Sequence, residues 1–278
     1  MNGEMRKIES GPEADAMIKA AYKDRGRVYT NCFMFADKLH RYAEDGRLSA
    51  MEVPDGLLLF LDMDEYDILY YYICPDRGLT FEKREKPVVI EFFEFENRKN
   101  KQNDIMVPYF ESAGFYKHNL IRRLAAEYDQ EKIETLLARP VDEREVITAR
   151  PEHADEIIEM VFGAFDPLKN LMPSKSDVRE SIKNGEYLCI LSDAGKVVCT
   201  MQAVYEKASY YMLYVVTDPE WRFKNLSFII RKAAILKAWE LGLKKRYGWW
   251  LDGNEPGLIA ARKTGLDFDG ASMLHYIK

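Results

Sequence analysis

The sequence is poor in the residues from which metal sites and disulfides are built. Its 278 residues include only four cysteines and four histidines. No two cysteines form a Cys-x-x-Cys pair, and the histidines are scattered without the spacing of metal ligands. We therefore expect reduced, buried thiols, and neither a metal site nor a disulfide framework.

Long apolar runs and long basic runs are also missing. The longest apolar segments, residues 56–61 and 68–74, are far shorter than the roughly 20 residues that cross a bilayer. No apolar stretch typical of a secretory signal follows the first residues. The net charge of −6 disfavours nonspecific binding of nucleic acid. These absences predict a cytoplasmic protein that binds neither membranes nor nucleic acid.

The composition that is present is typical of a globular protein of roughly two domains, at about 150 residues per domain. Helix and strand patterns alternate along the chain and predict an α/β (α+β) protein. Expected helices cover residues 12–23, 30–44, 107–113, 124–137, 153–164, 176–183, 226–241 and 256–263. Expected strands cover residues 48–53, 57–62, 68–74, 88–95, 187–191, 196–205, 209–216, 246–251 and 273–277.

The two halves of the chain share part of this pattern. A turn glycine precedes a strand at Gly56 and again at Gly195, and an asparagine is followed eleven residues later by glycine at Asn103 and again at Asn254. The first half is shorter between these landmarks, in the region where the second half has a loop and a long helix. We interpret this as a duplicated unit and expect domains at residues 1–140 and 141–278.

The segment after the strand at 209–216 has the pattern of an anion-binding loop. A buried strand ends in Asp218-Pro219, and a short loop then leads to the start of a long helix. Backbone N–H groups at a helix N-terminus bind phosphate, and Arg222, Lys224 and Arg231 add positive charge. The alternative is that Asn225 or Ser227 only caps a core helix.

This segment resembles the phosphate loop of the GNAT superfamily of acyl-CoA-dependent N-acyltransferases. The family loop reads Gln/Arg-x-x-Gly-x-Gly/Ala, and here Arg222 stands at the first position, with Asn225 and Ser227 at the small-residue positions. The resemblance covers about residues 146–278 and is weak in the first half, which lacks the loop. It implies two GNAT-like domains, each with a mixed, mostly antiparallel twisted sheet flanked by helices, the first degenerate and the second binding acetyl-CoA or another acyl-CoA. The cofactor-binding residues that it implies are Val215, Val216, Thr217, Arg222, Phe223, Lys224, Asn225, Leu226, Ser227 and Asn254.

The resemblance also assigns roles in catalysis. Backbone N–H groups near Val215 and Val216 are expected to polarise the thioester carbonyl. Glu206 and Asp252 are candidate bases for the amine. Many family members have a tyrosine acid seven residues after the asparagine, where this chain has Ala261. Tyr247, Tyr276 or a water is then expected to protonate the thiolate, while Asn254 either bonds the cofactor arm or caps its helix.

Three functions follow from these residues. The first is an acyltransferase, in particular an acetyltransferase, that acts on an amine of a small molecule or peptide. The second, suggested by Ala261 and the altered loop, is a catalytically weak acyl-CoA-binding protein or sensor. The third is an aminoacyl-transfer relative, which would require a tRNA partner and is disfavoured by the acidic charge.

Overall fold

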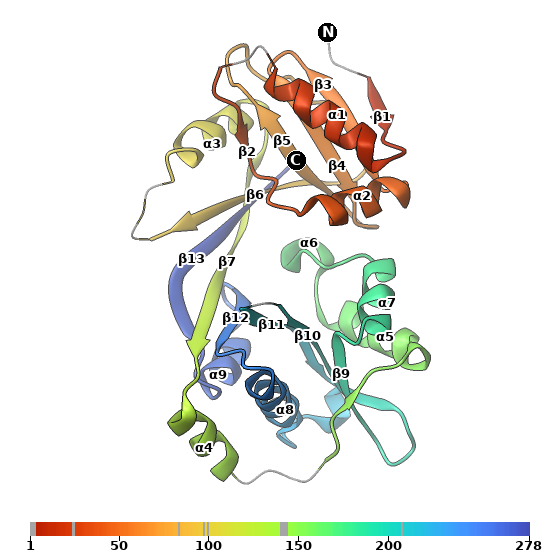
Figure 1. Cartoon of the computed structure of the whole chain (residues 1–278), viewed down its shortest axis with the longest axis vertical. Helices are drawn as coiled ribbons and strands as arrows, with labels where there is room; N and C mark the ends of the chain where they lie inside the picture. Colours follow the sequence, from red (N-terminus) through yellow and green to blue (C-terminus); the bar gives the residue numbers. More distant parts are fainter. Residues whose placement is uncertain are drawn as a thin grey trace. The chain divides into compact units, whose positions relative to one another are not determined.

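The computed structural model describes residues 4–23, 26–82, 84–96, 98, 100–139, 144–206 and 208–278. The chain divides into two compact units (Figure 1). The first unit is Met1–Leu120 together with Ser272–Lys278, and the second unit is Ile121–Ala271. The division therefore falls after Leu120, whereas the sequence predicted a boundary between residues 140 and 141. The last residues of the chain belong to the first unit.

The first unit is a sheet in the order β1-β3-β4-β5-β6, followed by the end of β13. Strands β3, β4 and β5 form antiparallel hairpins, whereas β5 and β6 pair in parallel over only two residues of each strand. The elements of this unit are β1 Met5–Lys7, α1 Gly11–Tyr22, β2 Tyr29–Thr30, α2 Ala36–Glu44, β3 Leu48–Val53, β4 Gly56–Asp62, β5 Asp67–Ile73, β6 Val88–Phe95 and α3 Asn103–Ser112. Two long strands, β7 Tyr116–Glu127 and β13 Asp267–Ile277, have residues in both units.

Aromatic rings fill the core of the first unit between its sheet and α3. The ring of Phe110 lies 5.0 Å from that of Tyr71 and 6.2 Å from that of Phe92, centroid to centroid. All three residues are buried. Large rings bury much apolar area at a small cost in side-chain entropy, so this core fixes how α3 packs on β5 and β6.

The second unit has the strand order β7-β12-β11-β10-β9-β8, with the start of β13 beside β7. Helix α8 packs on β9, β10 and β11, while α5 contacts α7 as well as β10 and β11 (Figure 1). The elements are α4 Gln130–Ala138, β8 Ile147–Thr148, η1 Pro151–His153, α5 Ala154–Ala164, α6 Pro167–Asn170, α7 Lys175–Lys183, β9 Tyr187–Leu191, β10 Val197–Tyr205, β11 Ser209–Thr217, η2 Pro219–Trp221, α8 Leu226–Glu240, β12 Lys245–Leu251 and α9 Glu255–Arg262.

Two expected helices were wrong in part. The expected helix at 30–44 begins only at Ala36, because residues 29–30 form β2 and Phe33 and Phe35 are exposed, at 78% and 79%. The expected helix at 124–137 is the end of β7 followed by α4. Strand pairing over Ile121–Glu127 with β12 overrides the local helical preference of that segment.

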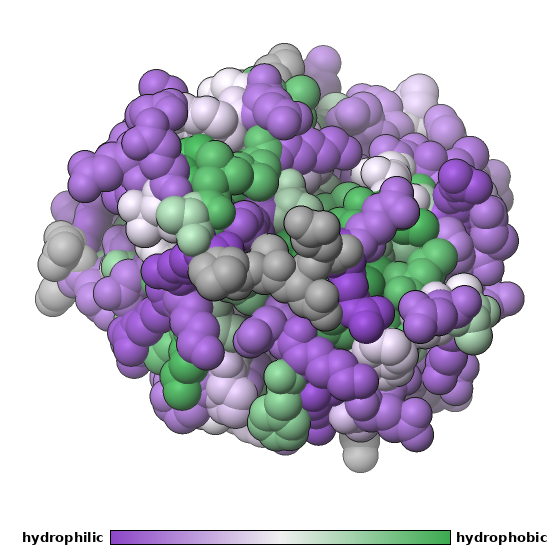
Figure 2. Space-filling view, turned by 90° about the horizontal axis from the view of Figure 1, so that it is seen from below, coloured by the Kyte–Doolittle hydropathy of each residue, from purple (hydrophilic) through white to green (hydrophobic). Residues whose placement is uncertain are grey.

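On the face that is visible in Figure 2, hydrophilic residues predominate and hydrophobic residues form separate patches. Among the described residues, none of the helices has both the length and the apolar character that a bilayer-spanning segment needs.

Candidate functional site

A wedge opens between β11 and β12 in the second unit. The two strands pair in parallel only from Ser209 to Tyr211 and from Lys245 to Tyr247. In the described residues no further pairing joins them, so the strands diverge beyond Tyr211 and Tyr247. The rings of these two tyrosines lie 5.6 Å apart at the closed end of the wedge. An extended ligand that enters the open end can use backbone groups of β11 that have no partner on β12.

A bulge interrupts β11 inside this wedge. Thr200 pairs with Val216 and Gln202 pairs with Leu213, so one residue of β10 faces two residues of β11, Tyr214 and Val215. Tyr214 has a positive φ of 48°. A bulge leaves its extra residue outside the ladder and turns a backbone N–H in a new direction. The structure therefore provides a strand irregularity where the sequence predicted that backbone N–H groups near Val215 and Val216 polarise a carbonyl.

The loop after β11 ends at the N-terminus of α8. Asn225 is the N-cap residue and has left-handed backbone, with φ 56° and ψ 16°, and its side chain makes no capping hydrogen bond. Asparagine tolerates this conformation better than most residues, so Asn225 can stand where the family loop has glycine. Ser227 is the second residue of the helix, as expected. The interpretation that either side chain serves only as a cap is not supported, because neither makes that bond.

The backbone N–H groups at this helix end are available to a ligand. Among the described residues, no acceptor is bonded to the N–H of Lys224, Asn225, Leu226 or Ser227. The first carbonyl of the helix, that of Asn225, already accepts from Phe228 and Ile229. Four unpartnered amides at the positive end of a 15-residue helix form a binding site for an anion such as pyrophosphate.

The side chains of the loop add positive charge and an exposed ring. Arg222, Lys224 and Phe223 are exposed, and Phe223 has a positive φ of 65°. The ammonium group of Lys224 lies 4.1 Å from the centroid of the Trp221 ring, which fixes its position over the loop. Asp218 holds the preceding turn, because its carboxylate accepts from the N–H of Glu220 and lies 3.4 Å from Lys196 Nζ.

The three candidate catalytic residues lie at different places: Tyr247 at the closed end of the wedge, Asp252 after the end of β12, and Glu206 away from the wedge. Tyr247 is the last residue of β12 that pairs with β11, with the guanidinium of Arg123 4.9 Å from its ring centroid. Glu206 lies in the hairpin turn between β10 and β11, at the opposite end of β11 from the phosphate loop. Asp252 is exposed in the turn after β12. The role of each stays a prediction, and the geometry favours Tyr247.

Asn254 caps α9, one of the two roles expected for it. Its side-chain oxygen accepts from the N–H of Gly257 at 3.2 Å, and its carbonyl accepts from Trp250 Nε1 at 2.6 Å. Ala261 is buried on the inner side of the same helix, with Leu258 and Leu266 in its cluster. Tyr276 belongs to the first unit, where its hydroxyl bonds Glu111.

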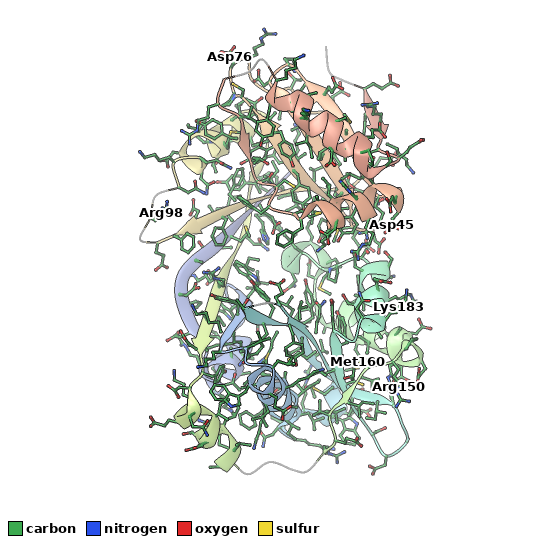
Figure 3. All side chains as sticks on the ribbon, viewed as in Figure 1. Asp45, Asp76, Arg98, Arg150, Met160 and Lys183 are labelled. Atoms are coloured by element: carbon green, nitrogen blue, oxygen red, sulfur yellow. The ribbon has the colours of Figure 1, made fainter. Side chains whose placement is uncertain are left out.

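In the first unit, a carboxylate of the chain itself occupies the corresponding amide cluster. After β5 the N–H groups of Asp76, Arg77 and Gly78 all donate to the carboxylate of Asp55, at 3.1–3.2 Å. Tyr109 donates a fourth bond, at 2.9 Å. Asp55 is buried, and Asp76 marks this turn in Figure 3. An anionic ligand would have to displace Asp55 to bind here.

The wedge of the first unit is also filled by the chain. Strands β5 and β6 diverge after Ile68 and Val89, as β11 and β12 do in the second unit. Asn31 bridges them: its amide nitrogen donates to the carbonyls of Leu69, at 3.0 Å, and Glu91, at 3.4 Å, and its oxygen accepts from the N–H of Tyr71. The first unit is thus closed at both places where the second unit is open.

The roles of Tyr214, Asp55 and Asn31 were not predicted from the sequence. Asp55 precedes the turn glycine Gly56, and an aspartate at a turn often accepts backbone hydrogen bonds, which is a signal for its role. Neither Asn31 nor Tyr214 has a local sequence signal, because the role of each depends on strands that are distant in sequence or on a shift of register.

Comparisons with known proteins show the fold. No family model matches the chain, and no curated protein matches its sequence. Among solved structures, a tandem GNAT protein from the clavulanic acid biosynthesis pathway matches with TM-score 0.60 and 12% identity over 99% of this chain and 98% of its own. A GCN5-related N-acetyltransferase from Sphaerobacter thermophilus matches with TM-score 0.54 and 15% identity over 88% and 86%. One from Kribbella flavida matches with TM-score 0.56 and 10% identity over 99% and 71%.

These matches agree with the mixed, mostly antiparallel sheet and flanking helices of both units. The chain therefore has the fold of the GCN5-related N-acetyltransferases.

Proposed function

We propose that the protein is an acyl-CoA-dependent N-acyltransferase, in particular an acetyltransferase, whose cofactor binds to the second unit. The observation that carries this proposal is the set of four unpartnered amides, Lys224 to Ser227, at the N-terminus of α8. In the first unit, the corresponding N–H groups after β5 already donate to the carboxylate of Asp55. This argues that only the second unit binds a pyrophosphate.

The residues present fit acyl-CoA along the wedge. The amides of Lys224 to Ser227 would hold its pyrophosphate, with Arg222 and Lys224 supplying positive charge. The divergent part of β11 would bond the extended arm, as a peptide strand would. When bound, acyl-CoA supplies an activated thioester carbonyl.

The chain's own groups then orient and polarise that carbonyl. A backbone N–H at the bulge of Tyr214 and Val215 would donate to the carbonyl oxygen, where negative charge develops during attack by an amine. The hydroxyl of Tyr247, at the closed end of the wedge, would return a proton to the leaving thiolate. We further propose that the acceptor is a small-molecule or peptide amine and that the protein acts in the cytoplasm.

A second candidate function, an acyl-CoA-binding sensor with weak activity, is favoured by Ala261. The position that holds the tyrosine acid in many family members is buried in the core of α9, so no group there reaches a thiolate. Binding of acetyl-CoA without turnover on a panel of amines would support the sensor over the transferase.

The test is a Ser227→Glu variant. A carboxylate in the first turn suits the helix, by a few tenths to about 1 kcal/mol, but it competes for the amides and repels a pyrophosphate. Loss of one charge-assisted bond costs about 1.5–3 kcal/mol, and we expect CoA affinity to fall about 10- to 150-fold by calorimetry.

A matched control exists in the same unit. Ser176 occupies the second position of α7, and Ser176→Glu adds the same charge to a helix start whose N-cap, Ser174, is already bonded. This control should bind CoA as the wild type does. An unchanged dissociation constant for CoA in a folded Ser227→Glu variant would contradict the assignment of this loop as the pyrophosphate site.

A further inference from the structure

Two arginines of the second unit have no carboxylate partner. Arg246, on β12, is 1% exposed, and Arg231, in the second turn of α8, is partly exposed but has a buried Nε. Within the described part of the chain, no carboxylate comes within 4.0 Å of either guanidinium. An arginine stays protonated in proteins, and a buried charge without a counter-charge is strongly unfavourable.

The hydrogen bonds of Arg246 reach only neutral groups. Its Nη1 donates to the hydroxyl of Tyr128 at 3.0 Å and to Oγ1 of Thr264 at 2.8 Å. Its Nε has no partner. The hydroxyl of Tyr128 donates in turn to the carbonyl of Thr264. This network holds the guanidinium in place and leaves both its charge and one N–H uncompensated.

Arg231 lies on α8 beside Ile230, which packs in the same core cluster as Tyr128 and Tyr210. Burial, and next the neighbouring charge of Arg246, lower the pKa of Arg231 to about 10. The Nε of Arg231 also has no partner. Two like charges held together in a protein interior are stable when a third, negative group lies between or beside them.

A third unpartnered donor is found at the same place. Tyr210 pairs with Arg246 across β11 and β12, and aligned residues of neighbouring strands point to the same face. Its hydroxyl is buried, without a partner, and close enough for Arg246 to act on its pKa. Three buried donor atoms therefore have no partner on this side of the sheet: Nε of Arg231, Nε of Arg246 and the hydroxyl of Tyr210.

We propose that Arg231, Arg246 and Tyr210 form a binding site for a compact oxyanion, a carboxylate or a phosphate, at the closed end of the wedge between β11 and β12. Guanidinium groups suit planar or tetrahedral oxyanions because their N–H groups are fixed in one plane. The tyrosine hydroxyl adds a neutral donor.

Two kinds of ligand could place an oxyanion at this site. The oxyanion is either a free ion or the terminal carboxylate of a dicarboxylic acyl chain on the donor. Tyr210 lies four residues before the bulge at Tyr214, about 13 Å along an extended strand, so an acyl chain that carries the oxyanion has to extend from the bulge towards the closed end. The second source rests on the proposed function, whereas the first does not.

The first experiment uses inorganic phosphate and the intact chain. At constant ionic strength, kept with a bulky organic sulfonate, saturating phosphate should raise the melting temperature of the wild type by about 2–4 °C. Arg231→Gln should abolish this rise. Lys237→Gln removes a charge from an exposed position of the same helix and should keep it.

The second experiment compares succinyl-CoA with acetyl-CoA by calorimetry. If the acyl chain carries the oxyanion, the wild type should bind succinyl-CoA about tenfold or more tightly than acetyl-CoA, and Arg231→Gln should remove that preference. A phosphate effect without the preference assigns the site to a free oxyanion. If the wild type binds neither CoA ester, the proposed function is contradicted. The phosphate experiment then still decides whether the oxyanion site exists.

Tyr210→Phe is the second variant, for the case in which Arg231→Gln does not fold. It removes one donor and no charge, and it should weaken the phosphate response without abolishing it. The proposal is overturned if neither phosphate nor succinyl-CoA has any effect that depends on Arg231 or Tyr210.

Discussion

Ala261 stands where many GNAT proteins have a tyrosine acid, and its surroundings show why the substitution is not a simple loss of a functional group. The side chain is 6% exposed and packs with Leu124, Trp250 and Leu258. Because these neighbours pack closely around Ala261, a larger side chain does not fit there without strain. The acid, if the protein has one, therefore has to come from another element.

Ala261→Tyr should accordingly destabilise the protein and add no activity. A ring forced into this packed cluster costs about 1–3 kcal/mol. Thermal unfolding of the second unit measures this. Ile259→Tyr, on the same helix at a position that is 56% exposed, is the control and should change the melting temperature little. A stable Ala261→Tyr variant with faster turnover would show that the position faces the ligand.

Glu91 and His275 are a pair whose pKa values move in opposite directions. Oε1 of Glu91 lies 3.7 Å from Nε2 of the fully buried His275. Burial raises the pKa of Glu91 from 4.5 to about 7. Burial, and next the charge of His118, lower the pKa of His275 from 6.5 to about 4. Both shifts favour the uncharged forms at mildly acidic pH.

From these two pKa shifts we expect two contributions to the pH dependence of stability that have opposite signs. Between pH 4.5 and 6.5 the unfolded histidine binds more protons than His275 does, so acidification destabilises the fold. In the same window the folded Glu91 binds more protons than the unfolded glutamate, so acidification stabilises it. The two slopes, each at most about 1.4 kcal/mol per pH unit, have opposite signs and offset each other in the wild type.

Glu91→Gln should reveal the histidine contribution alone. The free energy of unfolding of this variant should fall as the pH is lowered from 6.5 towards 4, measured by denaturant titration at several pH values. Glu85→Gln, at an exposed position before the same strand, should keep the profile of the wild type. A profile of Glu91→Gln that equals that of the wild type would contradict the shifted pKa of His275.

At the scale of elements, the sequence predicted what depends on neighbours along the chain. The strands β4 and β5 and the helix α8 follow from turn residues and apolar periodicity. The closure of the first wedge by Asn31 and the bulge at Tyr214 depend on pairing between distant segments. Local patterns contain no information on such pairing, which is also why the helix at 124–137 was predicted in place of the end of β7.

The bridge that Asn31 forms between β5 and β6 should contribute to the stability of the first unit. Asn31→Ala removes three hydrogen bonds to β5 and β6 and leaves backbone groups of Leu69 and Tyr71 unpaired. We expect a loss of about 2–4 kcal/mol in the stability of the first unit. The CoA affinity of the second unit should not change.

The control for this change is Asn184→Ala, at an exposed position after α7. Differential scanning calorimetry should show a lower melting temperature for Asn31→Ala only. Equal melting temperatures for the two variants would mean that the bridge of Asn31 contributes nothing to the first unit.

At the scale of the whole molecule, the first unit is completed by the last residues of the chain. Lys278 exchanges backbone hydrogen bonds with Val88 of β6, and its Nζ donates to the carbonyls of Phe81 and Ala113. The ring of Tyr276 packs edge-on against Phe92, 5.4 Å between centroids. Contacts between residues so far apart in sequence cost loop-closure entropy and form late, so we expect the first unit to fold only after the whole chain is available.

Deletion of Ser272–Lys278 should therefore destabilise the unit at the other end of the sequence. The deletion removes a strand from the sheet beside β6 and a ring from the core that contains Phe92. The transition of the first unit in differential scanning calorimetry should move to lower temperature or disappear. The second unit keeps its wedge and its loop, so CoA affinity by titration should stay within about twofold of the wild type. Tyr276→Phe removes only the bond to Glu111, and it should lower the same transition by a few degrees at most. If the deletion instead abolishes CoA binding and leaves the first transition in place, the final residues belong functionally to the second unit, and the division of the chain has to be redrawn.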